Sequence, residues 1–385
     1  MAATSAFAQS TVSITGNVDL GYRSVTQKGT TNADVATSNK TSNIAGNGAE
    51  GWTSSQVVLT VSEDMGNGMK GSFKIEQGIG TNPRSGLAKN LANLNGTNQG
   101  TGASLDNTVV GDREFWIAVD SGNTNVKLGY GGTAMRTLAL ATDAAGTNNY
   151  GNQIAHELGA YRRAGVTLTQ KMGAFTASVQ ASQNNDTQTT SEQKTGTGSN
   201  FGLTYAQGPL TLGYAYDVVK SVRLAYAHEA ALGGSIAPMV ALGDNSLAAL
   251  DNKMTTSIVA GSYDLGSVKA FAQYYTVKMD DNTAVIAKGE GKKKGSSIGL
   301  QAPMGNLVPF VQIFNGTNSQ SNKATFAGED RKVKGYTVGT RYNLSKRTYA
   351  YVVTGNLKTD AGSNTTNFGD KAEYKQTSFG LVHAF

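Results

Sequence analysis

Residues 11–23 read TVSITGNVDLGYR, and apolar and polar side chains alternate along them. Val12, Ile14, Val18, Leu20 and Tyr22 fall on one side of an extended chain, whereas the residues at odd positions are polar or glycine. Successive side chains of a β-strand point to opposite faces. The stretch therefore predicts a strand with one apolar face and one polar face.

The same alternation recurs to the end of the chain in segments of about ten residues. In the last segment, Phe379, Leu381, His383 and Phe385 share one side. Comparable rows are Phe175/Ala177/Val179/Ala181, Leu210/Leu212/Tyr214/Tyr216, Tyr336/Val338/Thr340/Tyr342/Leu344 and Tyr349/Tyr351/Val353. The opposite sides carry small and charged residues, which are too polar for the core of a sandwich. We expect the apolar rows to face lipid and water to fill the other side.

Composition agrees with an all-β membrane protein. The 385 residues include 48 Gly and 16 Tyr but only 5 Pro and no Cys. The uncharged stretch that most resembles a spanning helix, 230–243, is well short of the roughly 18 apolar residues that such a helix needs. The net charge is +6, but the basic residues are scattered, so nucleic-acid binding is not expected.

Short and long connections alternate. Short ones lie at 63–68, 121–124, 171–173, 207–209, 265–266, 303–306 and 344–345 and carry Gly, Asn or Pro. Long ones lie near 27–49, 79–108, 134–160, 184–198, 218–251, 280–294, 316–331 and 358–372. The sequence thus predicts a transmembrane antiparallel β-barrel of about sixteen strands, with short periplasmic turns and long extracellular loops. An even number lets the first and last strands pair and leaves no open edge.

The first residues of the chain carry a further signal. Ala6-Phe7-Ala8 matches a signal-peptidase pattern, so 1–8 is interpreted as the remnant of a signal peptide and 9–385 as one barrel domain. An ordinary N-terminus is the alternative. Residues 218–251 are the least defined part: 221–227 could extend a strand, and the Ala-rich residues beyond could form a short helix.

Three stretches carry a resemblance to the Gram-negative general porins of the β-proteobacterial type. Residues 54–76 resemble that family's second hairpin, with its Glu-Asp-Met-Gly-Asn-Gly turn, and 113–131 resemble the third. The ending Gly-Leu-Val-His-Ala-Phe matches the pattern G-L-x-H-x-F. This chain has Gln56 and Tyr130 where the family often has Arg, and the second of those arginines usually helps to latch subunits together.

The resemblance implies a homotrimer in the outer membrane with a water-filled channel for passive diffusion of small hydrophilic solutes and ions. Phe385 would belong to the assembly signal. The third long loop, 134–160, would fold inward and narrow the lumen; its charged residues and His are Arg136, Asp143, His156 and Glu157. Strand parity places Lys70, Lys74, Arg113, Lys127 and Arg163 on the lumen wall nearby, with Asp19 and Glu76 as the inward acids.

Loop acids opposite wall bases would set a field across the lumen, and our hypothesis is a mild preference for anions. The alternative is that these bases are solvated lumen residues with no part in selection. Parity with Trp116 and Ala118 would point Glu114 toward lipid, which is costly without a partner. Tyr22, Trp116, Tyr263 and Tyr274 are expected outside, at the membrane interfaces.

Gly295-Ser296-Ser297-Ile298-Gly299 matches the G-x-S-x-G of serine hydrolases, but it begins a predicted strand, so an enzyme is not expected. No motif suggests a metal or cofactor. A plugged barrel that binds through its surface loops is the alternative function, and a soluble β protein the third. Residues 288–294 (KGEGKKK) are either a solvated loop tip or a contact with the phosphates of lipopolysaccharide.

Overall fold

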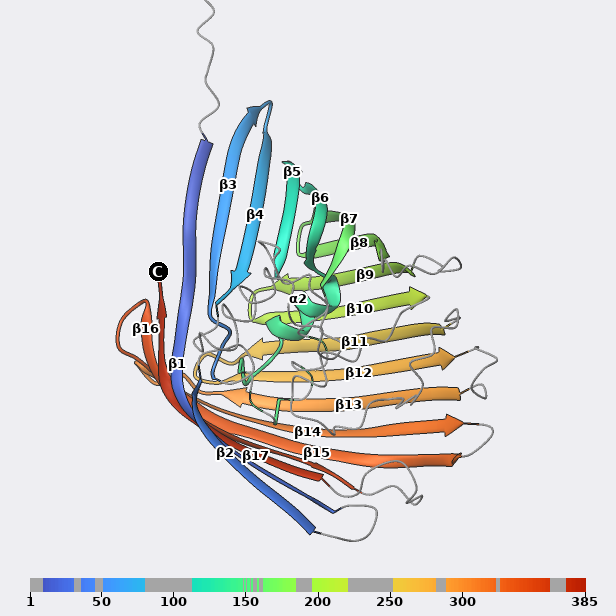
Figure 1. Cartoon of the computed structure of the whole chain (residues 1–385). Coiled ribbons are helices and arrows are strands. Elements are labelled where there is room, and N and C mark those ends of the chain that lie inside the picture. Colours follow the sequence, from blue (N-terminus) through green and yellow to red (C-terminus); the bar gives the residue numbers. More distant parts are fainter. Residues whose placement is uncertain are drawn as a thin grey trace, which may run out of the picture.

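A computed structural model describes residues 10–30, 36–45, 51–79, 113–147, 162–184, 196–220, 252–281, 289–322, 326–360 and 372–385, and single positions 149, 151, 152, 154 and 158. It is almost entirely β-structure, with the helix α2 (Ala134–Ala141) packed against strands (Figure 1). In the part of the chain so described, no helix has the length and hydrophobicity to cross a membrane.

The strands follow the chain in order. They are β1 (Ser10–Thr30), β2 (Ala36–Ala45), β3 (Gln56–Gly66), β4 (Met69–Gly78), β5 (Glu114–Ser121), β6 (Thr124–Gly132), β7 (Arg162–Met172), β8 (Phe175–Asn184), β9 (Gly196–Gln207), β10 (Leu210–Lys220), β11 (Asn252–Asp264), β12 (Lys269–Asp281), β13 (Gly289–Gln301), β14 (Leu307–Asn322), β15 (Phe326–Asn343), β16 (Thr348–Thr359) and β17 (Ala372–Ala384).

The strands form a closed antiparallel barrel. β1 pairs with β17 on one side, and on the other side with β2 along its second half and β3 along its first half. Because β2 and β3 share one position, the seventeen segments make sixteen strands around the ring, which confirms the predicted number and closure. Gly16 and Phe385 exchange two backbone hydrogen bonds of 3.1 and 3.0 Å, so the C-terminal residue is bound to β1.

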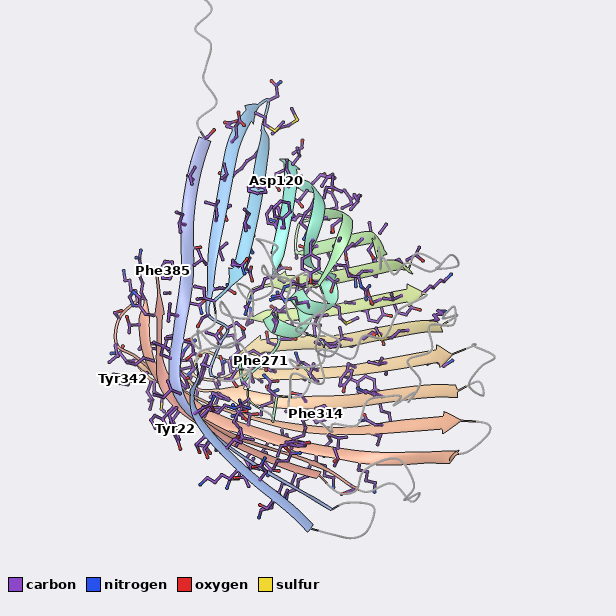
Figure 2. All side chains as sticks on the ribbon, viewed as in Figure 1. Tyr22, Asp120, Phe271, Phe314, Tyr342 and Phe385 are labelled. Atoms are coloured by element: carbon purple, nitrogen blue, oxygen red, sulfur yellow. The ribbon has the colours of Figure 1, made fainter. Side chains whose placement is uncertain are left out.

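The predicted apolar rows mostly form the outer face. Ile14 is 65% exposed, Val338 41% and Phe379 53%, although all are large apolar side chains. Exposed apolar rows on every strand are expected where lipid replaces water as the solvent. Tyr22, Tyr342 and Phe385 belong to the same outer surface (Figure 2).

One predicted row faces inward instead. Tyr351 is 5% exposed and Val353 0%, whereas Val352 between them is 46% exposed, so the outward assignment of the 349–353 row is wrong. The reason is that part of the interior is packed. Buried side chains from β10 to β12, β14 to β17 and β1, among them Phe314 and Leu357, form an apolar cluster with α2.

Several predicted long loops are shorter than expected because the strands run on. β12 continues to Asp281 and β13 begins at Gly289, so Lys292, Lys293 and Lys294 lie in a strand and the solvated loop-tip interpretation of this stretch is wrong. Likewise, β14 and β15 occupy most of 316–331. The predicted turn at 63–68 is confirmed, with Asn67 at a positive φ of 53° between two glycines. Residues 1–8 and 221–251 lie outside the described residues.

Candidate functional site

The third long connection folds into the barrel, as expected. Thr133 caps α2 through its Oγ1, which accepts a hydrogen bond of 3.3 Å from the backbone N–H of Arg136. α2 contacts β6, β9, β10 and β11 from the inside (Figure 1). Met135 and Leu138 are 0% and 3% exposed and turn toward this wall. The helix therefore lies on the inner surface of one side of the barrel.

Amide side chains on the wall hold this connection by hydrogen bonds. The bonds join Asn200 Oδ1 to Ala134 N (3.0 Å), Gln273 Nε2 to Ala139 O (2.6 Å), Gln301 Nε2 to Ala144 O (2.7 Å), Gln312 Oε1 to Ala145 N (3.0 Å) and Gln312 Nε2 to Asn152 Oδ1 (3.0 Å). They come from β9, β12, β13 and β14 and pair with polar groups of the connection, most of them backbone groups. Sequence reasoning missed this set, although inward amides on β9, β12, β13 and β14 were a signal for it.

Asp143 organises the connection itself. Its carboxylate accepts hydrogen bonds from Ala145 N (3.1 Å), Gly146 N (3.1 Å) and Asn152 Nδ2 (2.7 Å). Burial raises the pKa of Asp143 to about 6, and these donors oppose the increase. The Asp143 carboxylate is thus hydrogen-bonded to residues of its own loop. His156 and Glu157, the other predicted loop residues, lie outside the described residues.

A charged cluster occupies the opposite part of the wall, on β4, β5 and β7. Lys74 Nζ donates hydrogen bonds to Glu76 Oε2 at 2.8 Å and to Glu114 Oε2 at 2.9 Å. Arg162 Nη2 lies 3.8 Å from Glu76 Oε1. Trp116 Nε1 also donates to Glu114 Oε2, at 3.1 Å. Both carboxylates are therefore bound by cations and donors on the lumen side.

The prediction that Glu114 and Trp116 face lipid is wrong. Phe115 and Ile117 are 46% and 56% exposed on the outer face, whereas Glu114 is 9% exposed and turned inward. Residues 115–119 are apolar at every position, so hydrophobicity alone does not reveal which face is which. The charges do: Glu114 and Asp120 have the parity of Trp116, and two acids on one face mark the polar side. Tyr22, Tyr263 and Tyr274 are 40%, 45% and 48% exposed on the outer face, as expected.

Further cations surround this cluster. Lys127 Nζ lies 5.8 Å from the ring centre of Trp116. Arg113 Nη1 donates to Gln56 Oε1 at 3.1 Å. Burial lowers the pKa of the Arg136 guanidinium, and the charge of Arg162 lowers it further, while Glu114 and Glu76 oppose both effects. Arg136 of α2 therefore lies within electrostatic reach of the wall bases.

Arg163 is placed differently from the other predicted wall bases. Both of its Nη atoms donate to the two carboxylate oxygens of Asp217, one of them at 2.6 Å, and Asp217 is 0% exposed. Asn200 Nδ2 adds a bond of 3.2 Å to the same carboxylate. The positive charge of Arg163 is therefore neutralised by Asp217.

Lys70 is exposed, and the strand register places it opposite Asp120. Sequence reasoning missed both Asp217 and Arg162.

A second segment also enters the lumen. Residues 51–55 leave the wall between β2 and β3, and their backbone N–H groups at Trp52 and Thr53 donate to Asp19 Oδ2 at 2.6 and 2.8 Å. The Trp52 ring lies 5.4 Å from Phe310 and 5.5 Å from Tyr351, centre to centre. Ala145 of the third loop belongs to the same apolar cluster. Two inward segments thus meet inside the barrel.

Comparison with known proteins extends these observations. The profile of a family described as Gram-negative porin matches residues 1–362. No curated protein sequence matches the chain. Among solved structures, the chain is similar to an anion-selective porin from Comamonas acidovorans, with a TM-score of 0.65, 19% identity and coverage of 98% of this chain and 100% of that one. It is also similar to OmpT of Vibrio cholerae (TM-score 0.61, 13% identity, 98% of each chain) and to OmpF of Salmonella typhi (TM-score 0.58, 13% identity, 97% of each chain).

Proposed function

Because this chain belongs to the Gram-negative porin family and so forms an outer-membrane diffusion channel, we propose that its lumen favours anions. The observation behind the proposal is the charge balance of the cluster on β4 to β7 and α2. Its bases are Lys74, Lys127, Arg113, Arg136 and Arg162, and its acids are Glu76 and Glu114. The bases outnumber the acids, and a low-dielectric wall strengthens the resulting positive potential. The similar porin from Comamonas acidovorans is described as anion-selective.

In this proposal, the described part of the third loop, 134–147, lines one side of the constriction and the charged wall lines the other. The packing of α2 on β9 to β11 supports it, because that side is filled by apolar and amide contacts. Ions would then pass along the charged wall, next to the bases on β4 to β7. Arg163 would contribute little to selectivity, since Asp217 neutralises it.

Reversal potentials across planar bilayers in a KCl gradient test the selectivity. The wild-type channel should pass Cl⁻ more readily than K⁺, and Arg136→Gln together with Arg162→Gln should reduce the permeability ratio at least twofold. The matched control is Arg163→Met with Asp217→Leu, which removes a base and an acid together and should leave the ratio unchanged. Clear K⁺ selectivity of the wild type would contradict the proposal.

We also propose that the protein is a homotrimer. One of the similar structures, OmpT of Vibrio cholerae, is described in a trimer form. Native mass spectrometry of the detergent-extracted protein should give three chains per particle, and a monomer at all detergent concentrations would exclude the trimer.

No enzymatic role is proposed, since Gly295 to Gly299 lie inside the continuous strand β13 and Ser297 is buried there.

The plugged barrel remains a second candidate because part of the interior is filled. Tyr275, Phe314 and Leu357 are nearly inaccessible on the inner wall, where they form one apolar cluster with buried residues of the third loop. Single-channel recording separates the two functions: an open lumen gives large, regular conductance steps, whereas a plugged one conducts little. We favour the open channel, because the charged wall on β4 to β7 would be desolvated at high cost if it were covered.

A further inference from the structure

An arginine and a tyrosine lie together on the inner wall at the short-turn end of the lumen, next to the turn that joins β15 to β16. Arg341 is near the end of β15, and Tyr349 is near the start of β16. Strand parity turns both inward: Tyr342, the neighbour of Arg341, is 48% exposed on the outer face (Figure 2), whereas Tyr349 shares the face of the buried Tyr351. The guanidinium carbon of Arg341 lies 5.7 Å from the centre of the Tyr349 ring. We call these two side chains the arginine–tyrosine pair.

The pair rests on a packed aromatic layer. The ring of Trp52 lies 6.0 Å from Tyr349, 5.5 Å from Tyr351 and 5.4 Å from Phe310, centre to centre. Trp52, Tyr351 and Phe310 are 6%, 5% and 4% exposed, whereas Tyr349 is only half-buried. Close packing from behind holds the Tyr349 ring in one orientation. The pair therefore presents a preformed surface to the lumen.

Arg341 is a base without an acidic partner. Its Nε is buried and makes no hydrogen bond, and within the described ranges neither its Nη nitrogens nor the Tyr349 hydroxyl has a hydrogen-bond partner in the protein. A buried donor without a partner costs free energy, and an ion or water bound at the site is a common explanation. Arg163 differs, because both of its Nη atoms donate to Asp217. The guanidinium of Arg341 is therefore available to a solute.

The charges around the pair favour an anion. Lys346 and Arg347 are exposed in the adjoining turn, and Lys269 lies at the same end of the wall, three strands away on β12. From β11 round to β1, the acids described near this end are Asp264 and Asp19. Asp264 is exposed and opposite Lys269 in the register, while Asp19 is 0% exposed and already accepts three hydrogen bonds. The potential at the pair is therefore positive.

We propose that the arginine–tyrosine pair binds aromatic carboxylates at the short-turn end of the lumen. A guanidinium presents parallel N–H donors that match the two oxygens of a carboxylate. The aromatic ring of the solute then lies offset on the exposed face of Tyr349, and the free phenol hydroxyl is a further donor. An aliphatic acid of equal charge lacks the ring contact. Binding is on the order of millimolar, because a channel must also release its solutes.

This site is separate from the charged cluster proposed to set the ion selectivity. The cluster lies on β4 to β7 and α2, whereas the pair lies on β15 and β16. The double variant Arg136→Gln with Arg162→Gln should therefore bind aromatic carboxylates as the wild type does, even where it changes the ion permeability ratio. Loss of binding in this variant would place the solute at the charged cluster and overturn the proposed site.

The test titrates benzoate against the tryptophan fluorescence of the refolded, detergent-solubilised protein. The chain has two tryptophans, so a Trp116→Phe background leaves Trp52, 6.0 Å from Tyr349, as the single probe. We expect a saturable change with benzoate. Cyclohexanecarboxylate has the same charge but no aromatic face, and it should bind at least threefold more weakly. Equal binding of the two acids, or no saturable change with benzoate, would overturn the proposal.

Variants in the same background identify the residues. Arg341→Gln should weaken benzoate binding at least tenfold, and Tyr349→Leu should remove the preference for benzoate over cyclohexanecarboxylate. The matched control is Lys269→Gln, which removes a base that lies 5.1 Å from the ring of Phe271 and should leave binding unchanged. Heat-modifiable mobility like that of the wild type shows that each variant folds.

Two outcomes with the variants contradict the site. Benzoate binding by Arg341→Gln within twofold of the wild type would exclude the guanidinium as the carboxylate partner. Equal weakening by Arg341→Gln and Lys269→Gln would mean that the general positive charge of this end, and not the arginine–tyrosine pair, attracts the acid.

Discussion

The phenol hydroxyl of Tyr351 donates a hydrogen bond of 2.8 Å to Oδ1 of Asp19, although 332 positions separate the two residues in the sequence. Tyr351 is on β16 and Asp19 on β1, so the bond crosses the last strand, β17, where the barrel closes. Gly21 and Gly380 lie under the hydroxyl, and a Cβ at either position would collide with it. The contact ties the two sides of the closure together.

Tyr351→Phe should therefore lower the free energy of unfolding by about 1.5–3 kcal/mol, the range for a hydrogen bond to a charged group. Asp19 is fully buried, so water cannot replace the lost donor. Urea titration followed by the mobility shift between folded and unfolded barrel measures the change. Tyr349→Phe is the matched control, one inward position away, and should cost less than about 0.5 kcal/mol. Equal effects of the two variants would refute the role of the hydroxyl.

The position of the third loop depends on the absence of a side chain at Gly299. A Cβ there would overlap the methyl group of Ala144. We expect Gly299→Ala to push the loop from the wall toward the charged cluster and to reduce single-channel conductance. Combining it with Ala144→Gly moves the methyl group across the contact and should restore most of the conductance, since total volume is conserved. Failure of this rescue would show that the contact does not set the loop position.

Asp143 should make the folded protein more stable at acid pH than at neutral pH. Its pKa is raised by burial from 3.8 to about 6, so between about pH 4 and pH 6 the folded state binds more protons than the unfolded state. Stability from this group is therefore highest below pH 4, falls as the pH rises to 6, and is level above it, with a slope of at most about 1.4 kcal/mol per pH unit. Subtracting the pH profile of Asp143→Asn from that of the wild type isolates this term. A difference profile without a downward slope would disprove it.

Removing the carboxylate opposite Arg163 should be more costly than removing the whole pair. Asp217→Asn leaves a buried guanidinium facing a neutral amide, and we expect a loss of about 3 kcal/mol or more in unfolding free energy. Arg163→Met with Asp217→Leu replaces both charges by apolar groups and should cost clearly less. Urea unfolding of the single and double variants measures both. A double variant less stable than Asp217→Asn would argue that the pair itself is strongly favourable.

Much of the barrel was predictable from local pattern. The alternation at Val12 and Ile14 and at Phe379 and Leu381 identified outer faces, because lipid requires an apolar side chain at every second position. It failed where both faces are apolar, as at Phe115 to Val119 and at Tyr349 to Val353. In the first case a Trp–Glu hydrogen bond, and in the second an aromatic cluster around Trp52, occupies the inner face.

The candidate site was predictable only in part. Lys74 and Lys127 were assigned to the lumen wall by parity, and the structure places both there. Their partners were not predictable, because Glu114 lies 40 positions from Lys74 and Asp217 lies 54 positions from Arg163. The inward course of 51–55 was not predicted either, since nothing in those residues alone distinguishes a strand from an inward bend.

The sequence by itself determined that this chain crosses a membrane as a closed ring of alternating strands, because the solvent on each side of a strand dictates side-chain polarity at every second residue. Only the tertiary structure decided which charges balance one another and which wall the third loop covers. Those features depend on strand register and on contacts between distant segments, and hydrophobic alternation carries no information about either.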